Sequence, residues 1–246
     1  MRQMIKLMVM LLLLSITTTT NAAKVNATGV ISSFEGTIEP FTNIDIAGAF
    51  DVTLAYGDSY SYKMEADEVF KSLNIFKVEE QTLYINLKGI KNNLKMKKGL
   101  PKIIIYVPST VKFDEIDIEV SGASSFKTDD LKAKTLVLEV SGASSVSFKR
   151  MEIIDFELEI SGAVGVELNG YADKCDIEMS GASSLRARDL DVKRCSVELS
   201  GVSSAKIGKV SDVLNVEISG VSKLYYSGNP VKTSFDTSGV SKIEMY

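Results

Sequence analysis

The chain has 246 residues, of which 45% are hydrophobic and 24% charged, and its formal net charge is −4. This composition excludes a generally disordered chain and suits one or two folded units with a buried core. The acidic balance, with no concentrated cluster of Lys and Arg, argues against a nucleic-acid partner.

Residues 1–22 have the layout of a cleavable secretory signal. Arg2 and Lys6 give a positive start, an almost wholly apolar run follows from Leu7 to Ile16, and Ala22 and Ala23 mark the cleavage region. The apolar run is too short to span a bilayer, and no later segment is long and apolar enough to do so. The sequence therefore predicts an exported protein in the periplasm, at the outer-membrane surface or outside the cell, without a transmembrane segment after signal cleavage.

Residues 23–110 predict an irregular β region that caps the first edge of a repetitive stack. Within it, Ile44–Leu54 matches the later repeats position by position, with Ala47 in place of their corner serine. A weaker copy runs through Leu83 and Ile85. Terminal repeats are usually atypical because an open edge invites aggregation.

Two further elements are expected in this region. The acidic stretch Glu65–Leu73 suggests a short helix, and an apolar strand at Lys102–Val107 ends at Pro108. Because Pro cannot donate a backbone hydrogen bond to a sheet, the boundary between the irregular and repetitive parts is placed near it.

Residues 111–246 repeat one pattern. A Ser-Gly-Ala or Ser-Gly-Val triplet recurs, and its serines are spaced by 20, 20, 19, 20, 19 and 19 residues. Apolar residues alternate with polar ones before each triplet, as in Leu136–Val140, and again after it, which is the period of a strand with one buried face. A fixed period with like positions once per repeat predicts stacked coils that share a core. The predicted fold is therefore all-β, a right-handed parallel β-helix of about 20-residue coils.

The glycine of each triplet is predicted to form a sharp corner of the coil. Glycine tolerates the positive φ that such a corner needs, and the small residue after it lets successive corners stack. A Ser-Gly pair could also belong to a nucleophile, but catalysis needs one site and this feature recurs in every coil. The corner glycines are Gly122, Gly142, Gly162, Gly181, Gly201, Gly220 and Gly239.

One column of carboxylates precedes the corners by two residues. Its apolar neighbours point inward, so these side chains are expected to point outward and to repel one another by roughly 1 kcal/mol per neighbouring pair in water. Calcium bound by carboxylate oxygens is one candidate for offsetting this repulsion, and a solvated acidic stripe is the other reading. The column comprises Glu119, Glu139, Glu159, Glu178, Glu198, Glu217 and Asp236.

Cys175 and Cys195 occupy the same position of adjacent coils, five residues before Ser180 and Ser200. Their side chains are expected to point inward and to lie side by side. Export permits a disulfide between them, and the alternative is two buried thiols packed as small apolar groups. A metal site would need further ligands that the pattern does not supply.

The chain contains no His, which removes the usual nucleophile–base systems and the His metal sites. The uniform carboxylate column has no distinct acid and base partners, so we expect a non-enzymatic module. This module is expected to bind a protein or a glycan and to have no cofactor. The alternative is a carbohydrate-active enzyme that uses the outward carboxylates. The last coil presents an open edge that could pair with a second copy, so a homodimer is a further expectation.

The start of the first coil around Phe41–Leu54, the strand before Pro108 and the repeated Ser-Gly-Ala-Ser corners together resemble a known family. They are similar to the bacterial putative auto-transporter adhesin family with the head GIN domain, over nearly all of the mature chain. The resemblance implies an exported, β-helical protein of the cell envelope with an adhesion-like role.

Overall fold

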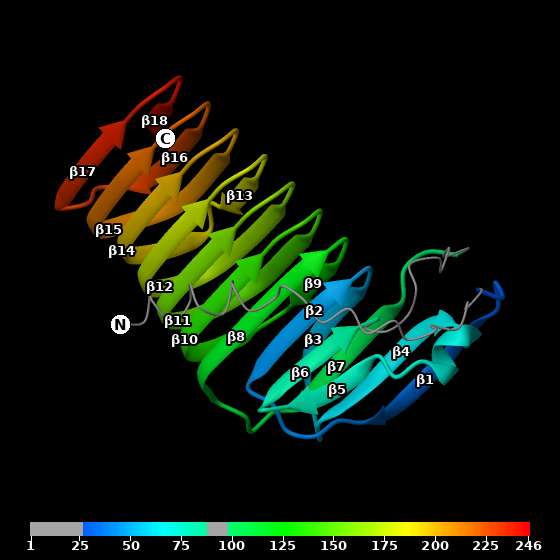
Figure 1. Cartoon of the computed structure of the whole chain (residues 1–246). Coiled ribbons are helices and arrows are strands. Elements are labelled where there is room, and N and C mark those ends of the chain that lie inside the picture. Colours follow the sequence, from blue (N-terminus) through cyan, green and yellow to red (C-terminus); the bar gives the residue numbers. More distant parts are fainter. Residues whose placement is uncertain (1–26, 88–97) are drawn as a thin grey trace.

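The computed structural model describes residues 27–87 and 98–246, so the predicted signal at residues 1–22 lies outside the described residues. The described parts contain eighteen strands and one short 3₁₀ helix, and the strands join into one continuous sheet that winds into a solenoid (Figure 1). This confirms the predicted right-handed parallel β-helix.

The regular stack consists of parallel strands joined coil to coil. Leu138 lies opposite Ile118 on one side and Leu158 on the other, and Leu158 in turn lies opposite Ile177. The strands of this part are β8 (Phe113–Gly122), β9 (Ser125–Thr128), β10 (Leu131–Val140), β11 (Ser145–Ile160), β12 (Gly165–Met179), β13 (Ser184–Ala187), β14 (Leu190–Leu199), β15 (Ser204–Ile218), β16 (Lys223–Gly228), β17 (Lys232–Thr237) and β18 (Lys242–Met245).

The core is built from inward columns that run along the axis of the solenoid. In β10, Leu136, Leu138 and Val140 are buried while Glu139 between them is exposed. Aromatic rings fill the wider parts, and the rings of Phe126 and Phe148 in adjacent coils meet edge to face with centroids 6.0 Å apart. Since one coil cannot bury its own apolar face, the stack is what closes the core.

The corner glycines have a positive φ, as predicted. Gly162 has φ +95°, and a Cβ added to it would lie 2.5 Å from the carbonyl oxygen of Gly142 in the preceding coil. That carbonyl accepts a hydrogen bond from the amide of Ala163 at 2.8 Å, so the corners are tied together by their backbones. A side chain at the glycine position would push these backbones apart.

The first regular coil comes from the N-terminal part of the chain. Strands β2 (Asn43–Gly48) and β3 (Asp51–Gly57) stack on β8 and β9, with Ile44 opposite Ile118 and Gly48 opposite Gly122. Their other sides pair with β6 (Thr82–Asn86) and β7 (Lys102–Pro108). Leu83 lies opposite Ile44 and Ile85 opposite Ile46, so both partial copies of the repeat are real coil positions.

Antiparallel strands close this end of the stack. Strand β4 (Ser61–Asp67) pairs with β7 and with β1 (Ile31–Thr37), and β5 (Phe76–Glu79) pairs with β6. The expected helix over Glu65–Leu73 is only partly correct. The structure has a 3₁₀ helix, η1 (Glu68–Ser72), and the residues before it belong to β4 because they pair with β1.

Asp67 fastens this cap. Its carboxylate accepts hydrogen bonds from the amides of Gly29 at 2.6 Å, Thr28 at 3.1 Å and Val69 at 3.2 Å. Burial alone would raise the pKa of Asp67, but these hydrogen bonds to the ionised form outweigh it, and the pKa lies below its usual value.

Substituting one corner glycine tests the backbone contact between coils. Gly162→Ala forces a Cβ against the Gly142 carbonyl at a positive φ, so we expect a loss of about 2 kcal/mol or more in the free energy of unfolding, measured by urea denaturation. Gly165→Ala in the same coil is the matched control, because nothing lies within 4 Å of its added Cβ. A similar loss from both variants would contradict the corner argument.

Candidate functional site

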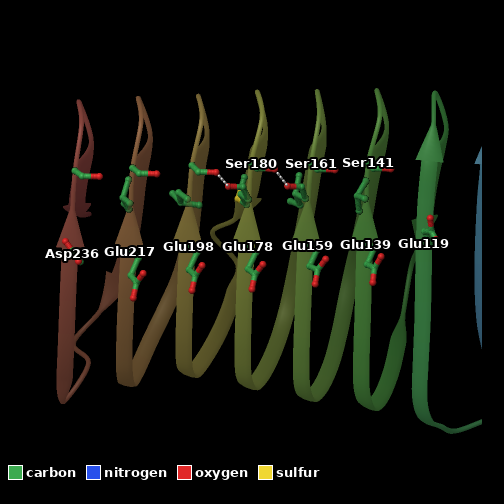
Figure 2. A pocket seen from close by; sticks show the side chains of 18 residues that line it. Glu119, Glu139, Ser141, Glu159, Ser161, Glu178, Ser180, Glu198, Glu217 and Asp236 are labelled. Atoms are coloured by element: carbon green, nitrogen blue, oxygen red, sulfur yellow. Dashed lines mark hydrogen bonds between the residues drawn. The ribbon is translucent and has the colours of Figure 1, made fainter. Parts of the chain in front are cut away.

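The predicted carboxylate column forms one row along the solenoid, and Figure 2 shows its members on successive strands. Each carboxylate lies directly opposite the next, as Glu139 does with Glu159 and Glu159 with Glu178. The row also includes Asp45, which pairs with Glu119 and was not predicted. We call these eight residues the acidic row: Asp45, Glu119, Glu139, Glu159, Glu178, Glu198, Glu217 and Asp236.

The sequence did contain the signal that identifies Asp45. It stands two residues before Ala47-Gly48, as each other member stands two residues before its Ser-Gly corner. The replacement of the corner serine by Ala47 obscured that equivalence, and the register of β2 on β8 restores it.

A groove of about 510 Å³ runs beside the acidic row. The members of the row from Glu119 to Asp236 form one wall, and the corner serines from Ser141 to Ser238 form the other. The Ser180 hydroxyl donates a hydrogen bond to the Ile160 carbonyl at 3.3 Å, and the Ser200 hydroxyl donates to the Met179 carbonyl at 3.4 Å (Figure 2). Because these hydroxyls donate to the backbone of the preceding coil, they present lone pairs to the groove.

The acidic surface widens toward the N-terminal end of the stack. A second hollow of about 780 Å³ is lined there by Asp45 and Glu119 of the row and by further carboxylates in neighbouring columns, among them Asp117, Glu157 and Asp176. Tyr84 of β6 lies opposite Asp45 and also lines this hollow. Asp117, Glu157 and Asp176 were not singled out from the sequence, because the one column that they share also contains Val137 and Ser196 and so does not repeat one residue type.

The stacking of like charges changes how readily the row ionises. Burial raises the pKa of Glu178, and the charges of Glu159 and Glu198 on either side raise it further. Burial likewise raises the pKa of Glu119, followed by the charges of Asp45 and Glu139. The row is therefore a strip of carboxylates in which burial and like-charged neighbours oppose the ionisation of Glu119 and Glu178.

Other columns of the surface handle charge differently. There, a cation in one coil meets an anion in the adjacent coil, as in the pairs Lys132–Glu152 at 2.9 Å and Lys193–Asp173 at 2.9 Å. Further pairs of this kind join adjacent coils at Lys134–Asp114, Lys149–Asp129, Arg150–Asp130 and Lys127–Asp51. The alternation of sign that balances these columns does not occur along the acidic row.

The carboxylates of the row do not converge on a point. Within residues 27–87 and 98–246, no group of three or more Asp, Glu, Cys or His residues is arranged to hold a metal ion. Calcium prefers six to eight oxygen ligands around one centre. Calcium binding by the row stays a prediction, without a preformed cage in the described residues.

Cys175 and Cys195 are brought together as predicted. They lie opposite each other on β12 and β14, and both are buried free thiols. The hydrogen bond with Cys195 and burial both raise the pKa of Cys175 well above its usual value. The pair therefore packs as part of the core, and Cys175 has little thiolate character at neutral pH.

The comparisons with known proteins agree on the fold. Residues 40–230 match the model of a family described as putative auto-transporter adhesin, head GIN domain, which confirms the resemblance seen in the sequence. No curated protein matches the chain. No helix in the described residues is long and apolar enough to span a membrane.

Solved structures with the same fold are distant in sequence. A putative adhesin from Bacteroides fragilis has a TM-score of 0.78 at 17% identity, over 90% of this chain and 99% of that one. A putative adhesin from Parabacteroides merdae has a TM-score of 0.69 at 18% identity, over 91% and 99%. A putative lipid binding protein from Parabacteroides distasonis has a TM-score of 0.57 at 18% identity, over 90% and 99%. At these identities the likeness shows the fold alone.

Neutralising a carboxylate in the middle of the acidic row tests its repulsion. Glu178→Gln should raise the free energy of unfolding at pH 7 by up to about 1 kcal/mol. The sign follows from the raised pKa of Glu178, since the folded protein holds this proton more firmly than the unfolded chain and stability falls as the pH rises through the folded-state pKa. The advantage of the variant should therefore shrink toward about pH 4, measured by thermal unfolding at both pH values.

Glu152→Gln is the matched control for this variant, because Glu152 is an exposed carboxylate that pairs with Lys132. Its removal should leave stability at pH 7 unchanged or slightly lower. If both variants were stabilised equally, the effect would belong to net charge and not to the row.

Titration of thiols without reductant tests the cysteine pair. We expect no reaction in the native protein, because both side chains are buried, and two reactive thiols in denaturant. A Cys195→Ala variant should then give one. Absence of reactive thiols in the denatured protein would instead establish a Cys175–Cys195 disulfide.

Proposed function

Because the chain belongs to the putative auto-transporter adhesin family with the head GIN domain, we propose that it is an exported, non-enzymatic adhesion-like module that binds its partner along the acidic row. The observation that carries this proposal is the unbroken row of eight carboxylates, seven of which, from Glu119 to Asp236, line the groove. Solenoids offer such long, regular faces as extended binding surfaces.

The chemistry of the groove favours a partner that donates hydrogen bonds. One wall carries carboxylates, which when ionised only accept hydrogen bonds, and the other carries serine hydroxyls such as Ser180 and Ser200 that donate to the backbone. A repeated spacing of one carboxylate per coil, about 4.8 Å, suits a polymer or a surface with several positive groups. We infer a protein or glycan that presents amines or guanidinium groups.

The same surface supports a binding role over a catalytic one. Hydrolysis by paired carboxylates needs one acid and one base in different environments. The members of the row occupy equivalent positions in successive coils, and the pKa values of Glu119 and Glu178 are raised by the same causes, first burial and then like-charged neighbours. A carbohydrate-active enzyme remains the competing hypothesis that the binding experiment also addresses.

Export is inferred from the N-terminal sequence. Arg2 and Lys6 followed by the apolar run to Ile16 have the order of a secretory signal. The periplasm, the outer-membrane surface and the extracellular space are all consistent with it, and each would expose the acidic row to components of the envelope or of the cell's surroundings.

Binding to immobilised poly-L-lysine and to glucosamine oligomers, measured by biolayer interferometry, tests the acidic row. The triple variant Glu159→Gln, Glu178→Gln and Glu198→Gln should weaken binding to these amine-bearing probes by about tenfold or more, and added salt should weaken wild-type binding. Oligomers of N-acetylglucosamine lack the positive charge and should bind poorly.

The matched control carries the same charge change elsewhere. Asp114→Asn, Asp129→Asn and Glu152→Gln remove three exposed carboxylates that pair with lysines of adjacent coils, and binding should be retained. Equal losses in the two triple variants would assign binding to net charge and reject the acidic row. Release of reducing ends from an oligosaccharide would favour the enzyme.

A further inference from the structure

The C-terminal end of the solenoid is an open edge. Among the described residues, no strand pairs with the outer side of β17 or β18 (Figure 1). All six residues of β17 are exposed, whereas β14 and β15 below it alternate buried and exposed residues. Unpaired backbone groups on such an edge are a template for another strand.

The core columns reach this edge without a cover. Phe235 continues the column of Val197 and Val216, which are 0% and 2% exposed, yet Phe235 itself is 45% exposed. In β18, Ile243 continues the column of Leu224. The apolar interior therefore ends on a surface that an additional layer would bury.

The last residue does not cover the edge. The Tyr246 hydroxyl donates a hydrogen bond to the Ile207 carbonyl at 3.0 Å, and its ring lies 4.8 Å from the Arg188 guanidinium. Both partners belong to earlier coils, so the side chain of Tyr246 points back along the stack. Within residues 27–87 and 98–246, no strand covers the outer side of β17.

The backbone of β17 fixes which residues can accept a new strand. The Ser238 amide donates to Ile218 of the preceding coil at 2.8 Å. Since backbone groups alternate in direction along a parallel strand, those of Thr233, Phe235 and Thr237 face the open edge. An antiparallel strand can therefore pair with β17 only if each of these residues lies opposite a residue of the new strand whose own backbone N–H and C=O groups also point toward the shared edge.

The charges of β17 select one such register for a second copy of the same strand. When Ser234 lies opposite Ser234 of the partner, Thr233 faces the partner's Phe235 in a hydrogen-bonded pair. Lys232 then faces the partner's Asp236 in a non-hydrogen-bonded pair, where side chains come closest. The two-fold axis repeats the Lys–Asp pair, so both ends of the paired strands carry opposite charges.

We propose that β17 pairs antiparallel with β17 of a second copy in this register and joins two solenoids end to end. The contact is isologous and closes after two copies, because the other end of each solenoid carries the antiparallel cap of β1, β4 and η1. Asp236 is shared with the end of the acidic row and its groove, but the rest of the paired edge lies apart from the surface proposed above for partner binding. The dimer does not depend on that function.

Charge reversal tests the register. The purified protein should sediment as a dimer that dissociates on dilution, and Lys232→Asp or Asp236→Lys should each raise the dissociation constant by about tenfold or more, because each sets like charges opposite one another twice. An equimolar mixture of the two variants should recover the dimer, because the mixed pair again opposes Lys to Asp at both ends. Sedimentation velocity measures all four samples.

Lys174→Asp is the matched control, because Lys174 occupies the position in an inner coil that Lys232 occupies in β17 and lies between Asp155 and Arg194. This substitution should leave the dimer unchanged. Circular dichroism establishes that each variant is folded. The proposal is overturned by a wild-type monomer at every concentration or by failure of the two variants to recover association on mixing. Oligomers longer than a dimer would also overturn it, since they indicate a head-to-tail contact.

Discussion

Backbone hydrogen bonds between coils hold each residue of one coil directly over its equivalent in the next. The amide of Ala163 bonds to Gly142 and the amide of Ala143 to Gly122, so the corners advance by one fixed step. Each side chain in a column therefore lies next to the side chains at the equivalent positions of the adjacent coils and has to be compatible with them. Apolar columns satisfy this by merging into one core, and several charged columns satisfy it by placing opposite charges in adjacent coils, as Asp129 and Lys149 do.

The acidic row breaks this rule, because like charges lie opposite one another along it. The fold tolerates the row because the repulsion within it is small relative to the stabilisation from the buried core. Repulsion between exposed neighbours amounts to roughly 1 kcal/mol each in water, whereas burial of one large apolar side chain contributes about 1.5–3 kcal/mol. Each coil buries several, including Leu136, Leu138 and Val140 in a single strand. Burial in the core therefore compensates for the repulsion between the carboxylates of the row, and the fold can keep the like-charged surface that is proposed above to bind a partner.

The sequence predicted the structure of the regular coils but not the arrangement of the N-terminal segments where the repeat is interrupted. Equivalent positions, the corner glycines and the facing cysteines all followed from a constant spacing of about 20 residues, because stacking depends only on that spacing. The spacing does not say which distant segments become neighbours where the repeat is broken. The placement of β2 and β3 between β6 and β7 on one side and β8 and β9 on the other, and the antiparallel cap beyond, therefore came only from the structure. The equivalence of Asp45 to the acidic row was overlooked because Ala47 stands in place of the corner serine.

The position of β2 has a consequence for the order in which the molecule assembles. Its two neighbours are β6, which follows about forty residues later, and β8, whose equivalent residues lie 74 positions further along, as for Ile44 and Ile118. Closing such long loops is slow compared with adding one coil to the next. Nucleation among the local repeats after Phe113 is therefore the faster route, and β2, although synthesised before these repeats, is among the last elements to reach its final neighbours.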